Sequence, residues 1–337
     1  MELEVVSIND LTQNELKKVD AFIMSEFTNG EFINSVKYLS YHRDRFVTDS
    51  IMICDKQSKT IEGVVMATAE DNMVISHKGT TFAGPIVSLK NSYDKTKSII
   101  ELVLDYYENK YDIVCFKTTP TLYAYQETGV LDYILLQHGY KYGMTALSNV
   151  IKINSIHSED ELFRLYDSKK RNQVRKAIKC NEFVFNRESL IDEKIWNFMN
   201  KNLAEKYQVC STHSYDEIAD LQQRFPNHIV PYTVKTNNGE YAAFGLIFKF
   251  KNVFHTQYLD MNYEYAMKCP NLFLVHNLIQ EAMKEGYSVF SFGASTEKGG
   301  EYLNEGLLAY KAGYGGGNIV MPIYIKEKRG IKLCTHL

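Results

Sequence analysis

Polar side chains that could carry acid–base chemistry occur in the stretch 252–318. His255 lies in the middle of a mainly apolar run, and Asp260 lies near the end of the same run. A histidine with an ordinary pKa near 6.5 could accept a proton from an amine at neutral pH, and Asp260 is the alternative base. Both positions also allow a structural interpretation, as a packed strand histidine and as a solvent-facing cap.

A second polar group follows the next apolar run. Lys311, in a short helix predicted over 306–312, could meet a phosphate, although a cation near a helix end also suits the helix dipole. Ser295 and Asn304 could bind a ligand, or could cap the loop and the helix that follow.

The order of apolar and polar segments predicts a strand–helix–strand crossover that would bring these two groups together. Residues 253–261 have the β-branched and aromatic content of a strand, Pro270 begins a helix, and residues 289–293 form the next strand. Ligands of such units lie at the carboxyl ends of the strands. We expect a cleft there, with His255 and Gln257 on one strand face because side chains alternate with period two.

Positive charge is concentrated in residues 168–179, which hold six basic residues and no acidic one. Val174, Ala177 and Ile178 give this segment an apolar seam, so we predict a helix that packs on a core and presents a cationic face. Such a face could bind phosphate groups. The alternative is a solvated linker helix between two lobes.

Length and composition limit the class of protein. A chain of 337 residues with 45% hydrophobic residues favours two domains, and a net charge of −3 argues against a general nucleic-acid coat protein. The six cysteines form no CxxC pair, which suits reduced thiols, and no histidine pair has zinc-helix spacing, so no metal is expected. The acidic start and the lack of a long apolar run predict neither a leader nor a membrane span, and hence a cytoplasmic protein.

The two halves of the sequence repeat one order of elements. The turn at Asn72 recurs at Asn252, 180 residues later, and we predict similar lobes over 1–153 and 154–337. The first lobe is predicted to contain strand 3–8, helix 11–27, a hairpin over 51–69, a hairpin or meander over 73–87, helix 93–108, strand 112–116 and further short strands over 133–153. The second is predicted to add a helix from His213 to Arg224, a hairpin over 229–250 and a final strand over 319–325.

Four stretches of the sequence resemble the tandem-GNAT proteins related to the Fem peptidyltransferases, and most of all the GNAT-type acyltransferases of bacterial surface-polysaccharide gene neighbourhoods. The resemblance extends over about half the chain, mostly its second half. It implies an α/β fold with mixed sheets in two GNAT-like lobes, and transfer of an acyl or aminoacyl group to an amine. The stretches are Ser168–Arg171 with Val174–Ala177; Thr212–Glu217 with Leu221; His255–Tyr258; and Phe292–Thr296 with Gly300, Leu303–Leu307, Lys311 and Gly313–Gly315.

Two departures from the family pattern bear on the donor. GNAT enzymes place a glycine-rich turn before the helix that holds the coenzyme A pyrophosphate, whereas residues 262–269 contain no glycine. The helix N-terminus with Lys268 can still hold phosphate. No sustained heptad run matches the coiled-coil arm of some Fem enzymes, so acetyl-CoA or another acyl-CoA is favoured over aminoacyl-tRNA as the co-substrate.

The resemblance also implies a substrate class and residue roles. The favoured acceptor is the amine of a nucleotide- or lipid-linked amino sugar in cell-surface polysaccharide synthesis. Two other functions stay open: a Fem-like, aminoacyl-tRNA-dependent peptidyltransferase acting on a peptidoglycan precursor, and a GNAT-like binding module without activity. The expected catalytic residues are His255, Asp260 and Tyr310; the expected donor-binding residues are Lys268, Asn271, Ser295, Asn304 and Lys311; and the expected acceptor-binding residues are Lys169, Arg171, Arg175, His213, Gln257 and Tyr258.

Overall fold

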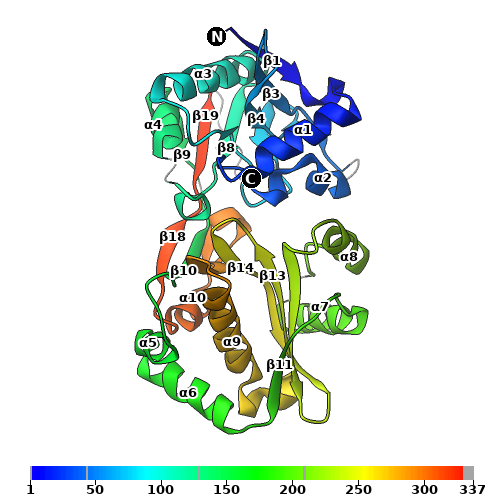
Figure 1. The fold of residues 1–337 in the computed structure, drawn as a ribbon, viewed down its shortest axis with the longest axis vertical. Helices are drawn as coiled ribbons and strands as arrows, with labels where there is room; N and C mark the ends of the chain where they lie inside the picture. The colour runs from blue at the N-terminus through cyan, green and yellow to red at the C-terminus, as the bar shows by residue number, and fades with distance from the viewer. Residues whose placement is uncertain (1, 43–44, 127–128, 144, 208–209, 329–337) are drawn as a thin grey trace. The chain divides into compact units, whose positions relative to one another are not determined.

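The computed structural model describes residues 2–328, apart from 43–44, 127–128, 144 and 208–209 (Figure 1). These residues form two compact units. The first contains the described residues of Met1–Leu147, Thr296–Leu303 and Val320–Leu337, and the second contains those of Ser148–Ser295 and Asn304–Ile319. Both units combine helices with mixed sheets, which confirms the predicted fold class.

The first unit has two larger sheets, with strand orders β1-β3-β4-β7 and β2-β5-β6-β8-β19-β9, and a two-stranded sheet formed by β16 (Thr296–Glu297) and β17 (Tyr302–Leu303). Helix α3 packs against these sheets and buries Ile99, Val103 and Tyr107 in the core. The helices are α1 (Gln13–Met24), α2 (Val36–Leu39), α3 (Tyr93–Lys110) and α4 (Gly129–Gln137), and the strands are β1 (Leu3–Ser7), β2 (Val47–Thr48), β3 (Ile51–Asp55), β4 (Ile61–Val65), β5 (Ala67–Glu70), β6 (Met73–Ser76), β7 (Ile86–Val87), β8 (Ile113–Lys117), β9 (Lys141–Tyr142) and β19 (Ile323–Glu327).

The second unit has one seven-stranded sheet, ordered β11-β12-β13-β14-β15-β10-β18. Helix α9 packs across β11 to β15, and α7 and α8 contact β14 and β12 (Figure 1). The helices are α5 (Glu159–Leu165), α6 (Ser168–Lys179), α7 (Glu193–Tyr207), α8 (Tyr215–Arg224), α9 (Pro270–Lys284) and α10 (Glu305–Ala312), and the strands are β10 (Leu147–Lys152), β11 (Phe183–Arg187), β12 (Ile229–Thr236), β13 (Tyr241–Lys249), β14 (Val253–Met261), β15 (Val289–Ala294) and β18 (Gly317–Val320).

Each of the two largest sheets includes one strand that is distant in sequence from the other strands of that sheet. Strand β19 inserts between β8 and β9 of the first unit, although it follows every strand of the second unit in sequence. Strand β10 inserts between β15 and β18, although it precedes every other strand of the second unit. The residues predicted as one strand over 319–325 are therefore two strands, β18 and β19, in different sheets. The part of 154–337 that holds β19 lies in the first unit.

The predicted repeat appears as two matching parallel strand pairs. In the first unit β6 and β8 pair through Met73–Ile113, Val74–Val114 and Ile75–Cys115. In the second unit β14 and β15 pair through Val253–Val289, Phe254–Phe290 and His255–Ser291. The two ladders have the same length and begin at positions 180 residues apart on the first strand, so the repeat inferred from Asn72 and Asn252 is confirmed in the backbone.

Most predicted elements around the crossover agree with the structure, and one segment of the first unit does not. Strand β14 has the predicted bounds, and α9 and α10 begin within one residue of the predicted positions. The prediction of short strands over 133–153 is wrong for its first residues, because Tyr133–Gln137 belongs to α4. Its apolar residues Leu131, Ile134 and Leu135 are buried against the core at helical spacing, which the short segment did not reveal.

The described cysteines, Cys54, Cys115, Cys180, Cys210 and Cys269, are all free thiols, and Cys334 lies outside the described residues. Within the described part of the chain, no helix has the length and apolar character needed to span a bilayer.

Candidate active site

The candidate site begins where β14 and β15 part. Their parallel pairing ends at His255 and Ser291, yet β14 continues to Met261. Beyond His255, the edge of β14 that had faced β15 has no strand partner among the described residues. Backbone groups on such an edge are available to a ligand that lies in the gap. The two strands therefore part at the end of the crossover where the sequence predicts a cleft.

His255 occupies the last paired position, at the root of this gap. Its Nδ1 lies 3.0 Å from the Ser291 hydroxyl, and a Cβ on Gly293 would lie 3.2 Å from its Cε1. Burial, and next the charge of Lys311, lower the pKa of His255 to about 3. The ring is therefore neutral at neutral pH and holds a proton poorly. This favours a role in orienting a ligand over a role as general base.

A β-bulge in β14 decides which side chains share the face of His255. Thr256 pairs with Ile247 and Tyr258 pairs with Leu246, so Gln257 is an extra residue in the strand. The direct partners of His255, Tyr258 and Asp260 are alternate residues of β13, so these three side chains lie on one face of the sheet. Strict alternation along β14 would have sent Tyr258 and Asp260 to the other face.

This face of β14 carries a hydrogen-bonded group that includes three expected acceptor-binding residues. His213 Nδ1 lies 2.8 Å from the Tyr258 hydroxyl, and the Gln257 side chain also hydrogen-bonds to Tyr258. Trp196 of α7 packs edge-on against Tyr258, with ring centroids 5.0 Å apart. Its buried indole Nε1 has no hydrogen-bond partner. His213, Gln257 and Tyr258 are thus brought together, as the acceptor assignment requires.

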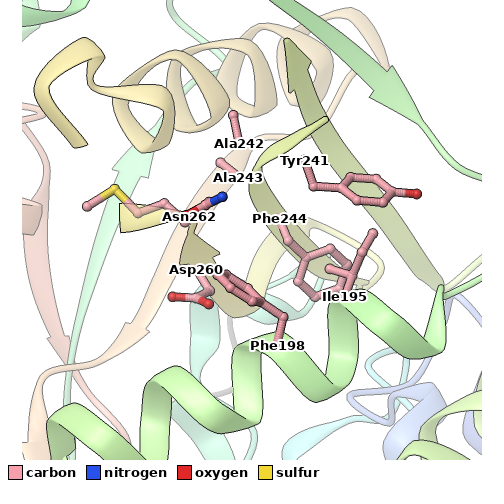
Figure 2. Close-up of a pocket in the computed structure, with 9 residues that line it drawn as sticks. Ile195, Phe198, Tyr241, Ala242, Ala243, Phe244, Asp260 and Asn262 are labelled. Atoms are coloured by element: carbon pink, nitrogen blue, oxygen red, sulfur yellow. The ribbon is translucent and has the colours of Figure 1, made fainter. Parts of the chain in front are cut away.

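Asp260 lies farther along the same face, in a small pocket between α7, the start of β13 and the end of β14 (Figure 2). Its carboxylate accepts a hydrogen bond of 2.7 Å from Asn202 Nδ2. Its β13 partner is four residues from the partner of His255, which separates the two side chains by about 13 Å along the strand. His255 and Asp260 therefore do not act on one atom. The pocket is lined by Ile195, Phe198, Tyr241, Ala242, Ala243, Phe244, Asp260, Met261 and Asn262.

Lys311 reaches the carboxyl end of β15 from helix α10. Its Nζ donates hydrogen bonds to the carbonyl oxygens of Gly293 (3.0 Å) and Ala294 (2.5 Å), and only 6% of the residue is exposed. No described carboxylate forms an ion pair with it. Burial lowers the pKa of the Lys311 ammonium to about 8, so it remains mostly charged at neutral pH. A buried cation with one donor left over suits the stabilisation of a developing negative charge.

The two predicted loop residues differ, because the Asn304 side chain has a structural partner and the Ser295 hydroxyl does not. Asn304 is the N-cap of α10, since its Oδ1 accepts a hydrogen bond of 3.0 Å from the backbone N–H of Leu307. The backbone N–H of Asn304 donates to the carbonyl of Ser295. The Ser295 hydroxyl is buried without a hydrogen-bond partner, as is the hydroxyl of Ser148. Two unsatisfied hydroxyls beside the end of β15 are available to a ligand or an ordered water.

A second cluster of site residues surrounds the N-terminus of α9. No side chain caps this helix, and its N-cap residue, Cys269, has a left-handed backbone. Asn271 Nδ2 donates to the Tyr310 hydroxyl over 3.2 Å. Burial raises the pKa of Tyr310 to about 12, so the phenol keeps its proton at neutral pH. An uncapped helix N-terminus with these donors is a site for an anion.

The cation that accompanies this helix end is Lys170, which the sequence analysis did not assign. Its Nζ lies 3.8 Å from the ring centroid of Tyr310 and 4.4 Å from that of Tyr314, and 7% of the residue is exposed. Burial lowers its pKa to about 8. The expected cation, Lys268, is instead exposed and paired with Glu182. The spacing of Lys170 with Val174 and Ala177, all buried on one face of α6, is the signal that could have identified it.

The basic segment forms helix α6, as predicted, and packs against α9. Lys169 is exposed, whereas Arg171 and Arg175 line an open hollow together with Arg164 of α5. Only these two of the three expected basic residues come together. Among the described residues, no group of three or more histidine, cysteine or acidic side chains could hold a metal ion.

Comparison with known proteins identifies the fold. Residues 164–312 match the family model of the acetyltransferase (GNAT) domain, which contains the parted strands, α9 and Lys311. The chain has a tandem GNAT fold. It is similar to the crystal structure of FemX, with a TM-score of 0.69 and 14% identity over 97% of both chains. It is also similar to a tandem GNAT protein from the clavulanic acid biosynthesis pathway, with a TM-score of 0.54 and 8% identity over 97% of this chain and 98% of that one.

A third similar structure is the C-terminal domain of a putative lysylphosphatidylglycerol synthetase from Agrobacterium fabrum. The TM-score is 0.60 and the identity 11%, over 94% of this tandem GNAT chain and 93% of that domain. No curated protein compared with the sequence matches it. At these identities the likeness concerns the fold, and the fold is one of acyl-group transferases. It confirms the resemblance to tandem GNAT and Fem-related proteins that the sequence motifs suggested.

Proposed function

We propose that this protein is an N-acyltransferase that transfers an acyl group, in the simplest case acetyl, from acyl-CoA to the amine of a nucleotide- or lipid-linked amino sugar. The observation that most supports this proposal is the gap between β14 and β15, with a buried ammonium at one side and an uncapped helix N-terminus nearby. A GNAT-type donor needs these features: an open strand edge for the thioester and an anion site for the diphosphate. We place the reaction in cell-surface polysaccharide synthesis.

The donor would lie with its diphosphate at the N-terminus of α9. The backbone N–H of Asn271, the Asn271 side-chain amide and the Lys170 ammonium would bind the phosphate oxygens. The Lys170 ammonium forms no ion pair within 4 Å among the described residues, although the nearby Asp167 carboxylate favours its charged form, so a diphosphate would add a direct counter-charge. The acyl arm would then extend along the unpaired edge of β14 toward His255.

The chemistry would be direct attack of the acceptor nitrogen on the thioester carbonyl carbon. The new C–N bond forms as the C–S bond breaks, the thiolate takes a proton from the Tyr310 hydroxyl, and Tyr310 regains a proton from the newly acylated nitrogen. The Lys311 ammonium would stabilise the carbonyl oxygen as it becomes negative. His255, neutral and held by Ser291, would accept a hydrogen bond from the acceptor amine. His213, Gln257 and Tyr258, with Asp260 at the far end of the face, would hold the remainder of the acceptor.

The experiment that tests the proposal is a product assay with purified protein. Acetyl-CoA is combined with a panel of nucleotide-linked amino sugars, and the products are separated by mass spectrometry while free thiol is measured. An acetylated amino sugar formed in equal amount to coenzyme A would support the proposal. Thiol release without any acceptor product, or no reaction with any acyl-CoA, would contradict it.

A second candidate function is aminoacyl transfer from a charged tRNA to a peptidoglycan precursor. The similarity to FemX over 97% of both chains favours this candidate, because it includes both units and not the acetyltransferase domain alone. The same reaction centre would serve, with a ribose oxygen in place of the thiolate. Product formation that requires charged tRNA and is not supported by any acyl-CoA would select this function.

A further inference from the structure

Three arginine side chains converge on an open hollow on the surface of α5 and α6. Arg164 comes from α5, and Arg171 and Arg175 come from successive turns of α6. Asp160 and Phe163 complete the lining. The four charged residues contribute three positive charges and one negative charge, which leaves an excess of two positive charges. This excess is local, since the whole chain has a net charge of −3.

The three guanidinium groups lack the partners that surface arginines usually find. Among the described residues, none of them forms an ion pair or a hydrogen bond with a carboxylate, and Asp160 takes part in no such pair. A guanidinium presents five N–H donors in a planar fork that fits phosphate oxygens in pairs. Three guanidinium groups without carboxylate partners around one hollow therefore favour a doubly charged oxyanion as the ligand.

The floor of the hollow is rigid. The Arg175 guanidinium lies over the Phe163 ring, 5.0 Å from its centroid, and the His276 imidazole stacks on the same ring with a centroid distance of 4.9 Å. His276 is itself fixed by Tyr166 and Glu159, each 3.0 Å from one ring nitrogen. Stacking on a fixed ring restricts Arg175 before any ligand binds, which lowers the entropic cost of binding.

The hollow is separate from the anion site at the start of α9. On α6, Lys170 lies on the buried face with Val174 and Ala177, whereas Arg171 and Arg175 lie on the adjacent stripe, about 100° around the helix. Along α9, His276 below the hollow is seven residues from the N-cap Cys269, or about 10 Å. One diphosphate cannot occupy both places, but one substrate with two phosphate-bearing parts can.

We propose that the hollow is a second phosphate-binding site, which takes a phosphate monoester or diphosphate carried by a substrate. The identity of this substrate rests on the proposed acyl transfer, in which two substrates carry phosphate groups. One is the 3′-phosphate of the coenzyme A donor, whose diphosphate would lie at α9. The other is the diphosphate of a nucleotide-linked acceptor.

Binding measurements without turnover test the site, so that its failure is distinct from failure of the acyltransferase proposal. Inorganic pyrophosphate is titrated calorimetrically into the full-length protein and into Arg171→Gln, Arg175→Gln and Arg175→Lys. Lys179→Gln is the matched control, because it removes an exposed charge from the same helix outside the hollow. Thermal unfolding of each variant verifies that the fold is retained.

The expected result is a loss of affinity of about tenfold or more for each Arg→Gln variant, from the loss of a charge-assisted contact. Arg175→Lys should lose part of the affinity, because it keeps the charge but not the fork. The Lys179→Gln control should change affinity less than twofold. Equal losses in the control and in the arginine variants, or no loss in any, would overturn the proposal.

The source of the phosphate is distinguished with two matched pairs of ligands. If the donor supplies it, Arg175→Gln should weaken binding of coenzyme A but not of 3′-dephospho-coenzyme A. If the acceptor supplies it, the variant should weaken binding of uridine diphosphate but not of uridine. Pyrophosphate binding that depends on the arginines supports the site in either case. Arginine-dependent binding of a single-stranded RNA, with no binding of pyrophosphate or any of these nucleotides, would assign the surface to nucleic acid and contradict the proposal.

Discussion

The two parallel strand pairs have the same backbone and different chemistry. At the third rung the first unit places Ile75 opposite Cys115, whereas the second unit places His255 opposite Ser291. Beyond that rung, the Ser76 hydroxyl accepts a hydrogen bond of 2.6 Å from the backbone N–H of Lys117, which keeps β6 and β8 connected. The position that matches Lys117 in the second unit is Gly293, which has a φ of +71° and leaves room for the His255 ring.

The helix that follows the first strand of each pair also differs between the two units, in how its N-terminus is capped. Helix α3 is capped by the Ser92 side chain, which accepts a hydrogen bond from the N–H of Lys95. Helix α9 has no side-chain cap. In the first unit a side chain satisfies one backbone N–H of the first helical turn, whereas in the second unit no side chain does so and the N–H of Asn271 is available. We infer that the second unit holds the reaction centre and that the first unit contributes structure.

The strongest test of this difference is removal of the buried lysine from each unit. Lys311→Met should lower kcat by about 10²–10³-fold, because it removes a preorganised charge from the developing oxyanion. Lys117→Met is the matched variant, since the Lys117 ammonium is also buried and hydrogen-bonded to a backbone carbonyl, that of Thr80. It should leave kcat within about threefold. Equal losses of kcat in the two variants would contradict the assignment of the reaction to the second unit.

The role of Lys311 can also be tested through the pH dependence of kcat. With a pKa of about 8, the Lys311 ammonium loses its charge as the pH rises through that value, so kcat should fall on the alkaline side. Lys311→Arg keeps the charge to higher pH and should move this limb upward. An alkaline limb that stays in place in Lys311→Arg would show that Lys311 is not the titrating group.

A second comparison replaces the third-rung residue in each pair. His255→Ala should raise the KM for the acceptor by about tenfold and leave the shape of the pH profile between pH 5 and 8 unchanged, because a histidine with a pKa of about 3 is neutral throughout that range. Ile75→Ala should leave the KM unchanged and cost about 2–5 kcal/mol of unfolding free energy. Loss of an acidic limb in His255→Ala would instead make His255 the general base.

The two candidate cations at α9 offer a test of smaller expected effect. Lys170→Met should raise the KM or Kd for acyl-CoA by about tenfold, through loss of one charge-assisted contact. Lys268→Met should change it less than twofold, since Lys268 is exposed and already paired with Glu182. Donor affinity measured by calorimetry or kinetics decides between them. A larger effect at Lys268 would restore the assignment made from the sequence.

The smallest expected effect concerns stability of the first unit. His42 and His77 stack with ring centroids 5.0 Å apart, and burial lowers their pKa values to about 4 and about 3. An unfolded histidine has a pKa near 6.5, so the unfolded state binds more protons below that pH and stability should decrease as the pH falls from 6.5 toward 4. His42→Gln should reduce the decrease between pH 7 and pH 5 by about 1 kcal/mol, after allowance for screening, as measured by urea unfolding. An unchanged slope would contradict this account.

Local patterns in the sequence predicted the crossover well and its side-chain geometry only in part. The bounds of β14 and the start of α9 follow from β-branched content and from Pro270 at the first turn, which are local signals. The bulge at Gln257 depends on pairing with β13, so the shared face of His255, Tyr258 and Asp260 could not be derived from alternation. The pairing of Lys268 with Glu182 joins residues 86 positions apart, and no local signal reports it.

Charged residues that lie on a packed helix face are the second kind of feature that the sequence analysis did not predict. Lys170 follows the spacing of the apolar seam of α6, yet a lysine is normally expected in solvent. Its place over Tyr310 and Tyr314 depends on α10, which is separated from α6 by more than a hundred residues. Arg164 was not assigned because helix α5, from which it extends, was not predicted. Sequence motifs found the segments of the site, and tertiary contacts determined which side chains within them meet.

The exchange of β10 and β19 has a consequence for the order in which a nascent chain can fold. Among the described strands, β19 is the one that joins β9 to its sheet, so the six-stranded sheet of the first unit is incomplete until β19 has been synthesised. By then every strand of the seven-stranded sheet has been synthesised, including β10, which was made before the rest of that sheet. The amino-terminal unit, although first to be translated, is therefore the last whose sheet can be completed, and until then its six-stranded sheet has an open edge.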